Sequence, residues 1–146
     1  MPRLRSPGRT GLEFALALSA AATGCRSVTS VPLLFSVSTT AAVYGPGDWV
    51  SARISNLSDE VLGFTVCQAD FDRYDGSRWT ATRLSPDLPC QSYMDWLNPM
   101  TSRVIIVQLG AGARSGVYRL RLPQVYSAGD VVLPEAQRCS NPFRVP

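Results

Sequence analysis

The sequence predicts an all-β protein, an antiparallel sandwich of about seven strands. Short apolar runs rich in Val, Ile, Thr and aromatic residues alternate with clusters of Gly, Pro, Asn and Asp. No window shows sustained helical periodicity, and turn signals recur at the spacing typical of a sandwich or barrel. The chain has 146 residues, 45% hydrophobic and 17% charged, a composition that fits one globular domain.

Turn signals separate the first four predicted strands. A Gly-Pro-Gly-Asp turn at 45–48 precedes a strand over 49–57, where apolar and polar residues alternate as on a strand with one buried face. The Asp75-Gly76 pair predicts a type I′ hairpin turn, which requires positive φ at both central residues. The four strands are expected at 34–40, 49–57, 64–73 and 78–84.

The last three strands follow a long loop over 85–102. Alternation along these strands places Tyr118 on the inward side, whereas Arg119 and Arg121 face outward. The stretch from Gly116 to Leu120 has the pattern of a tyrosine corner. It predicts a buried Tyr118 whose hydroxyl bonds to backbone a few residues upstream. The three strands are expected at 103–109, 117–122 and 143–145.

Six motifs follow one another along the chain: Gly45-Pro46-Gly47-Asp48, Ser55-Asn56-Leu57-Ser58, Asp75-Gly76-Ser77-Arg78-Trp79, Leu97-Asn98-Pro99, Gly116-Val117-Tyr118-Arg119-Leu120 and Ser140-Asn141-Pro142-Phe143. Their order resembles that of bacterial Ig-like domains, including domains related to the intracellular proteinase-inhibitor family. The resemblance covers about residues 33–146 and implies an immunoglobulin-like β-sandwich. Its motifs are mostly turn chemistry, so they inform the fold more than the function.

The first 24 residues are organised like a bacterial export signal. Residues 1–11 are basic, and residues 12–22 form an apolar run that is shorter than the ~20 residues needed to span a bilayer. The stretch from Ala22 to Cys25 resembles a lipobox, in which Cys25 becomes the lipidated first residue of the mature protein. Cleavage after Ala22 by the ordinary A-x-A rule is the alternative, and the protein would then be secreted without lipid.

This organisation divides the chain into three parts. Residues 1–24 form a lipoprotein signal peptide, residues 25–33 the lipidated Cys25 and a short tether, and residues 34–146 the Ig-like sandwich. The expected location is the cell envelope, at the periplasmic or outer-membrane face. The expected partners are the membrane, through the lipid anchor, and an envelope protein or glycan.

Net charge argues against nucleic acid as a partner. Three Arg and one Glu precede Cys25, so removal of the signal peptide lowers the formal net charge from +3 to +1. The mature sequence contains no basic cluster of the kind that binds phosphate backbones.

The chain contains neither His nor Lys, and all 14 basic residues are Arg. A Ser-His-Asp triad, a Cys-His pair, a Schiff-base lysine and a P-loop lysine therefore cannot be built from it. The stretch from Asp70 to Gly76 has the wrong spacing for an EF-hand, whose third ligand would be Tyr74 and whose final Glu would be Ala81. Asp70 and Asp72 are expected on one solvated strand face. The sequence thus predicts no enzyme, metal site or cofactor.

Three cysteines follow the export signal, and thiols tend to pair in oxidising compartments. If Asp75 and Gly76 are the two central residues of the hairpin turn, Cys67 lies opposite Leu84. Leu84 in turn lies six residues before Cys90. This register favours a disulfide between Cys67 and Cys90. Pairing of Cys139 with either of them stays open, because Cys139 begins the last strand at the same end of the sandwich.

The loop over 85–102 carries the candidate binding residues Tyr93, Met94 and Trp96, which belong to types enriched at protein interfaces. The other interpretation, that the side chains cover the core, is favoured for Trp96 and Leu97. Neither interpretation is favoured for Tyr93 and Met94. The predicted function is a non-catalytic binding or structural role in the envelope. The alternative is a protease inhibitor that acts through a loop at one end of the sandwich.

Overall fold

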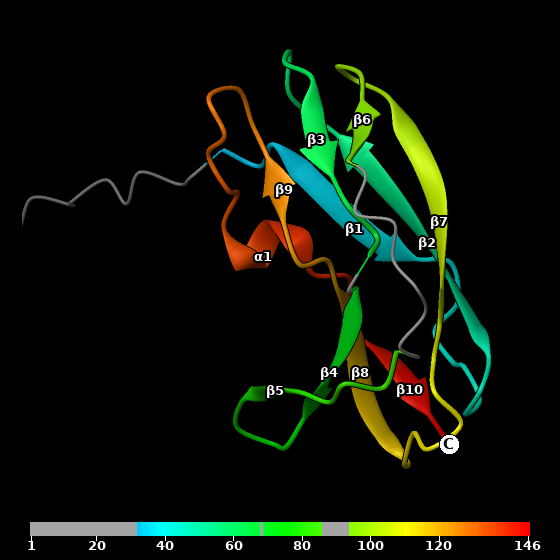
Figure 1. The fold of residues 1–146 in the computed structure, drawn as a ribbon. Coiled ribbons are helices and arrows are strands. Elements are labelled where there is room, and N and C mark those ends of the chain that lie inside the picture. Colours follow the sequence, from blue (N-terminus) through cyan, green and yellow to red (C-terminus); the bar gives the residue numbers. More distant parts are fainter. Residues whose placement is uncertain (1–31, 68, 86–93) are drawn as a thin grey trace, which may run out of the picture. The chain divides into compact units, whose positions relative to one another are not determined.

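Ten strands in three antiparallel sheets make up the described part of the chain, which covers residues 32–67, 69–85 and 94–146 of this computed structural model. They form an all-β, Ig-like sandwich, as the sequence predicts (Figure 1). The elements are β1 (Phe35–Thr39), β2 (Trp49–Asn56), β3 (Leu62–Phe64), β4 (Asp70–Tyr74), β5 (Trp79–Ala81), β6 (Asp95–Leu97), β7 (Ser102–Gln108), β8 (Gly116–Arg121), β9 (Val125–Tyr126), α1 (Glu135–Arg138) and β10 (Phe143–Val145).

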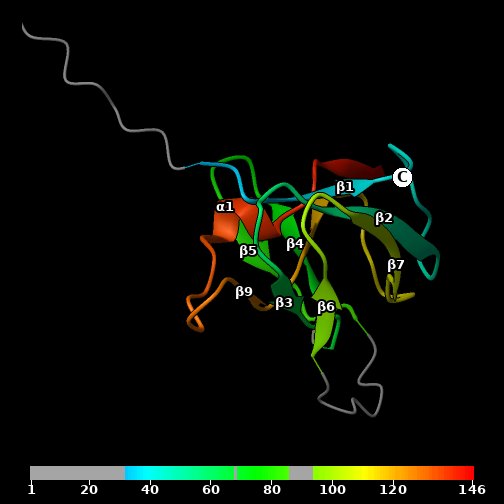
Figure 2. The ribbon, with the colours of Figure 1, turned by 90° about the horizontal axis from the view of Figure 1, so that it is seen from above.

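Two larger sheets and one small sheet carry these strands. The strand orders are β1-β2-β7, β10-β8-β4-β5 and β6-β3-β9. Figure 2 shows β2 beside β7 and, in the small sheet, β3 beside β6. β1 and the segment that follows it also contact the second sheet. Val37 of β1 forms a parallel bridge to Ser140, which precedes β10, and Val43, which follows β1, forms one to Arg144 of β10. Among the described residues, no helix is long and apolar enough to cross a membrane.

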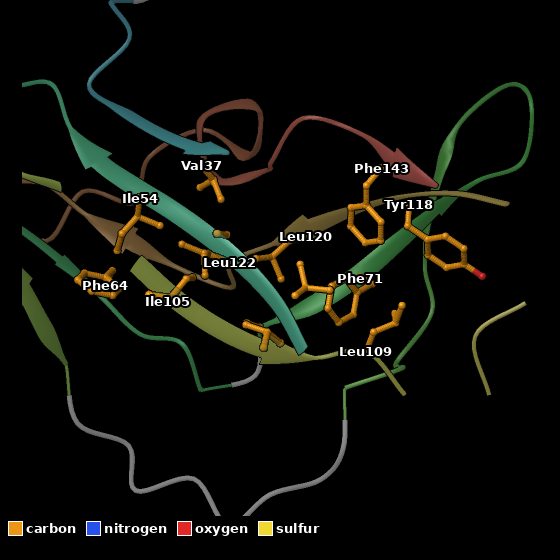
Figure 3. Packing of buried hydrophobic residues seen from close by; sticks show 14 of the residues in the cluster. Val37, Ile54, Phe64, Phe71, Ile105, Leu109, Tyr118, Leu120, Leu122 and Phe143 are labelled. Atoms are coloured by element: carbon orange, nitrogen blue, oxygen red, sulfur yellow. The ribbon is translucent and has the colours of Figure 1, made fainter. Parts of the chain in front are cut away.

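The core lies between the inward faces of the sheets (Figure 3). Alternation along β2 buries Val50, Ala52 and Ile54, as the sequence predicts. The ring of Phe143 packs against three other aromatic rings, with centroids 5.1 Å from Tyr44, 6.0 Å from Phe71 and 6.2 Å from Tyr118. The described residues belong to one compact unit with its own core, so this part of the chain can fold by itself.

Tyr118 forms the predicted tyrosine corner. The residue is 1% exposed, and its hydroxyl donates a hydrogen bond to the Arg114 carbonyl, with an O···O distance of 2.8 Å. Figure 3 shows the hydroxyl pointing away from the packed side chains. The ring therefore belongs to the core, while the polar tip ties down the loop before β8.

Replacing Tyr118 by Phe should lower the free energy of unfolding by about 1 kcal/mol, because the Arg114 carbonyl loses its partner while the ring packing remains. Urea unfolding followed by tryptophan fluorescence measures the change. Tyr74→Phe is the control, since the Tyr74 hydroxyl bonds to the Gly76 carbonyl at the surface. Equal midpoints for Tyr118→Phe and the unmodified protein would contradict the role of the corner.

The hairpin between β4 and β5 differs from the predicted type I′ turn. Tyr74 pairs with Trp79, so four residues form the loop, and of the two expected positive φ angles only that of Gly76 is present, at 99°. The reason is the Asp75 side chain, whose Oδ1 accepts from the backbone N–H groups of Ser77 and Arg78. These bonds lower the pKa of Asp75 to about 2. The predicted two-residue turn would pair Tyr74 with Ser77, whereas Tyr74 pairs with Trp79, so β5 is shifted by two residues relative to β4.

Short strands account for the other differences. The strand predicted over 64–73 is two strands, β3 and β4, and the predicted loops contain β6 and β9. These two strands have three and two residues, too few for alternation to be recognised. The return strand expected over 78–84 is β5, only three residues long. The described residues therefore form ten strands, where the sequence predicts about seven.

Candidate binding surface

One row of residues crosses the outer side of the small sheet. Trp96 of β6 lies opposite Gly63 of β3, Gly63 lies opposite Tyr126 of β9, and Tyr126 bridges Val132. Opposite residues of a sheet share one face, and the apolar residues that alternate with this row, Leu62, Phe64, Leu97 and Val125, are buried in the core. The row therefore faces outward. Together with Met94 it is called the β6 face below.

The β6 face exposes large apolar side chains. Trp96 is 60% exposed, Val132 44% and Met94 38%. Gly63 makes this arrangement possible, since a Cβ at this position would lie 2.5 Å from the Met94 Sδ and 3.1 Å from the Trp96 Cζ3. Because residue 63 has no side chain, the side chains of Met94 and Trp96 can lie over its backbone. A Trp and a Met beside each other on an open strand provide contact area for a partner.

The structure separates the residues that the sequence placed together. Leu97 is 3% exposed and covers the core, as predicted. The favoured interpretation of Trp96 as core cover is wrong, because its partner across the sheet is a glycine on the outer face. Met94 belongs to the candidate surface. Tyr93, Cys90 and Cys25 lie outside the described residues, so their predicted roles stay predictions.

An ion pair connects β6 to the neighbouring large sheet. Arg103 Nη1 of β7 lies 3.2 Å from Asp95 Oδ1 of β6, and the Arg103 guanidinium stands 5.8 Å from the centre of the Phe64 ring. Both charged side chains are at least one-third exposed, so the pair contributes only a few tenths of a kcal/mol. The pair joins the side chains of β6 and β7 across the surface.

Asp70 and Asp72 lie on one face of β4, but the prediction that this face is solvated is wrong. The Asp70 carboxylate accepts from the backbone N–H groups of Arg83, Leu84 and Ser85, with distances of 2.8 to 3.3 Å. A single carboxylate thus fixes the segment that follows β5. This bonding was not visible in the sequence, because it depends on the hairpin register.

Asp72 is at the centre of a charged cluster. Its Oδ2 accepts from Nε and Nη2 of Arg119, at 3.0 and 2.8 Å, and its Oδ1 accepts from Nε of Arg121 at 2.9 Å. Arg119 also donates to Glu135 Oε1 at 2.6 Å and stands 4.7 Å from the centre of the Trp79 ring. The Asp72 side chain is only 4% exposed. Two arginines from β8 therefore share the Asp72 carboxylate of β4 beside a tryptophan ring, and Glu135 supplies the second negative charge.

The same cluster contains three metal-ligand types. One ligand atom each of Asp72, Glu135 and Cys139 lies within 4.8 Å of the other two. Both Asp72 oxygens already accept from guanidinium groups. Burial raises the pKa of the Cys139 thiol to about 11, which keeps the sulfur protonated at neutral pH. A cation would have to displace two arginines and a proton, so these residues fit a structural ion cluster and do not fit a metal site.

The raised pKa of Cys139 should slow its chemical modification. Thiolate is the reactive form, and a pKa of about 11 in place of 9.0 lowers the thiolate fraction at pH 8 by about a hundredfold. Iodoacetamide should therefore alkylate Cys139 about a hundred times more slowly in the folded protein than in urea, as measured by peptide mass spectrometry. Similar rates in both states would show an accessible, ordinary thiol.

Cys139 is a free cysteine, which contradicts the two alternatives that paired it with Cys67 or Cys90. The disulfide between Cys67 and Cys90 stays the prediction. It closes a segment of 24 residues and should stabilise the fold by about 3 kcal/mol. Peptide mapping without reductant should yield a linked peptide that contains Cys67 and Cys90, and a linked Cys139 peptide would refute the assignment.

No family model matches the chain, and no curated protein matches it. Among solved structures, the chain is similar to the ASH / PapD-like domain of human CEP192, PapD-like domain 7. The two share 12% sequence identity over 97% of this chain and 94% of that chain, with a TM-score of 0.33. Function is therefore inferred from the residues of this chain.

Proposed function

We propose that the protein is an exported, lipid-anchored domain of a bacterial cell envelope, and that it binds an envelope protein or glycan through the β6 face without catalysing a reaction. The observation that carries the binding role is the exposure of Trp96, at 60%, beside Met94 on a glycine that leaves room for both. The lipobox-like sequence that ends at Cys25 supports the anchor.

A non-catalytic role agrees with the chemistry of the side chains. The chain has no His and no Lys, so acid–base or nucleophilic catalysis would depend mainly on carboxylates. Asp70 accepts from three backbone N–H groups, and Asp72 is bonded to two arginines. Neither carboxylate is available as a general acid or base.

The anchor is tested by the intact mass of protein extracted from membranes. We expect the loss of residues 1–24 and the addition of acyl chains at Cys25. Several acyl chains hold a protein firmly, since each buried CH₂ contributes about 0.8 kcal/mol. A mature protein that begins at Thr23 and carries no lipid would refute the anchor.

The binding role is tested by capture from envelope extract, with Trp96→Ala compared with Trp49→Ala. The two tryptophans are matched, because Trp49 of β2 is 58% exposed on the outer side of another sheet. Loss of a Trp at the centre of an interface typically weakens binding by tenfold or more. We expect Trp96→Ala to lose the captured partner and Trp49→Ala to retain it, with the melting temperatures of both unchanged.

Two results would refute this role. Equal capture by both variants would place the binding surface elsewhere, and a large loss of stability in Trp96→Ala would show that Trp96 serves the fold. A panel of proteases, assayed with and without the domain, separates the inhibitor alternative. Inhibition that survives Trp96→Ala would assign function to another loop of the sandwich.

A further inference from the structure

The loops at one end of the sandwich expose further large apolar side chains besides those of the β6 face. Five residues carry them, from four different segments. Met100 is 73% exposed, Val131 59%, Leu33 57%, Val61 44% and Leu57 42%. These five residues are called the loop end below. Single exposed apolar residues are ordinary, and it is their gathering on neighbouring turns at one end of the domain that makes this end a candidate contact surface.

Hydrogen bonds hold these segments at the same end. The Asn56 Nδ2 donates to the carbonyls of Glu60 and Asn98, at 2.7 and 3.1 Å, and so joins the loop before β3 to the turn after β6. The backbone N–H of Leu57 donates to the Leu34 carbonyl at 2.9 Å, which adds the segment before β1. Figure 1 shows these turns, together with the turn after β9, at the upper end of the domain.

The chain enters the domain at this end. Leu34 directly precedes β1, and only seven residue steps separate Cys25 from Pro32, the first described residue. A fully extended chain spans at most ~3.3–3.6 Å per residue, so these steps reach about 25 Å. If Cys25 is lipidated, the start of β1 and the turns around it are held within that distance of the bilayer.

We propose that the loop end docks on the bilayer itself, with its apolar side chains in the boundary between headgroups and acyl chains. This inference rests on the lipid anchor proposed above. The anchor makes the contact intramolecular in effect, so even a weak affinity of the loop end for lipid is sufficient. The β6 face, on the outer side of the small sheet, then stays available for its partner.

Charge identifies the kind of lipid surface. The loops over 57–61, 98–101 and 127–131 contain no Arg, and they carry the exposed carboxylates of Asp59, Glu60 and Asp130. Anionic lipids would repel these side chains. The apolar side chains would therefore make the contact while these carboxylates stay in the hydrated headgroup layer, and the matching surface is a zwitterionic bilayer.

Bromolipid quenching tests the contact in the lipidated protein. Met100→Trp places a reporter in the loop end, and Ile106→Trp places one at an equally open site on β7, where Ile106 is 61% exposed. Both proteins are purified from membranes and reconstituted in phosphatidylcholine vesicles with brominated acyl chains. We expect at least half of the added emission to be quenched for Met100→Trp and almost none for Ile106→Trp. Equal quenching at both sites, or at neither, would overturn the contact.

A second experiment omits the anchor. Residues 26–146 are produced without lipid, and partition into phosphatidylcholine vesicles is measured by flotation. The double substitution Met100→Ser, Val131→Ser should lower the partition coefficient by tenfold or more, because each removes apolar surface from the contact. Val104→Ser, Ile106→Ser on β7 should leave it unchanged. Equal partition of both variants, self-association through the loop end, or stronger binding on addition of phosphatidylglycerol would overturn the proposal.

The two proposals can fail separately. Unacylated Cys25 in the mass measurement would refute the anchor, whereas partition of the unlipidated domain into vesicles does not involve Cys25. An acylated protein whose Met100→Trp reporter is not quenched selectively would refute the loop-end contact and leave the anchor intact.

Discussion

Replacing Asn56 by Ala is expected to lower the free energy of unfolding by about 3 kcal/mol. Asn56 is 1% exposed, and its Nδ2 donates to the carbonyls of Glu60, Leu97 and Asn98, at 2.7 to 3.1 Å. Its Oδ1 accepts from the backbone N–H and the hydroxyl of Ser58, at 2.9 and 2.7 Å. The substitution leaves several buried polar groups without a partner, and each costs about 1–3 kcal/mol.

Asn56→Asp sharpens this prediction. The charged carboxylate would face the three carbonyls that Asn56 Nδ2 now binds, so folding should raise the pKa of the new side chain. A group with a raised pKa contributes stability at low pH and loses it as the pH rises through the folded value. The destabilisation, relative to the unmodified protein, should therefore be smaller at pH 4 than at pH 7.

Chemical denaturation measures both Asn56 variants. Asn141→Ala is the control, because Asn141 is an exposed amide whose Oδ1 accepts from the Thr39 N–H at the surface. This control should cost less than 1 kcal/mol. A cost for Asn56→Ala as small as that of Asn141→Ala would contradict the role of Asn56 as the connection between the two loops.

Replacing Asp72 by Ala is expected to cost about 2–3 kcal/mol. Removal of one partner of a fully buried ion pair costs about 3–5 kcal/mol. The value is discounted here, because the side chains of Arg119 and Arg121 are 15% and 25% exposed and are partly hydrated. The loss should arise chiefly from two guanidinium groups left without their carboxylate. The bond to Asp72 also raises the pKa of Arg121, in agreement with a favourable pairing.

A double-mutant cycle with Asp72→Ala and Arg119→Ala isolates the pair. We expect the double variant to be less destabilised than the sum of the two single variants, since the cost of leaving Arg119 without Asp72 is then absent, while Arg121 loses Asp72 in both backgrounds. Arg144→Ala, at an exposed arginine of β10, is the control and should add its cost independently. Additive costs for Asp72 and Arg119 would show that the cluster contributes no net pairing energy.

Prediction from the sequence succeeded where one face of a long strand is buried. Val50 and Ile54 alternate with polar residues along the eight residues of β2, and the pattern alone determines the face that each side chain takes. Tyr118 was also predicted, because a tyrosine corner combines a glycine, a buried ring and a strand start in one short motif.

Prediction failed where the outcome depends on a neighbouring strand. Asp72 faces outward, as alternation requires, but it is buried because Arg119 and Arg121 from β8 cover it. The exposure of Trp96 follows from the glycine opposite it, Gly63, which only the pairing of β3 with β6 reveals. No residue pattern within a single strand contains this information.

The position of β1 has a mechanical consequence. If the chain is anchored through Cys25, a pull on a partner bound to the domain is resisted through the first strand, β1. β1 pairs along its length with β2, from Phe35 opposite Asn56 to Thr39 opposite Ala52, and its Val37 also bridges Ser140. Tension along this strand loads all of these hydrogen bonds in shear, so they must break together. The first strand of the domain is thus the one whose extraction requires the sandwich to open on both sides.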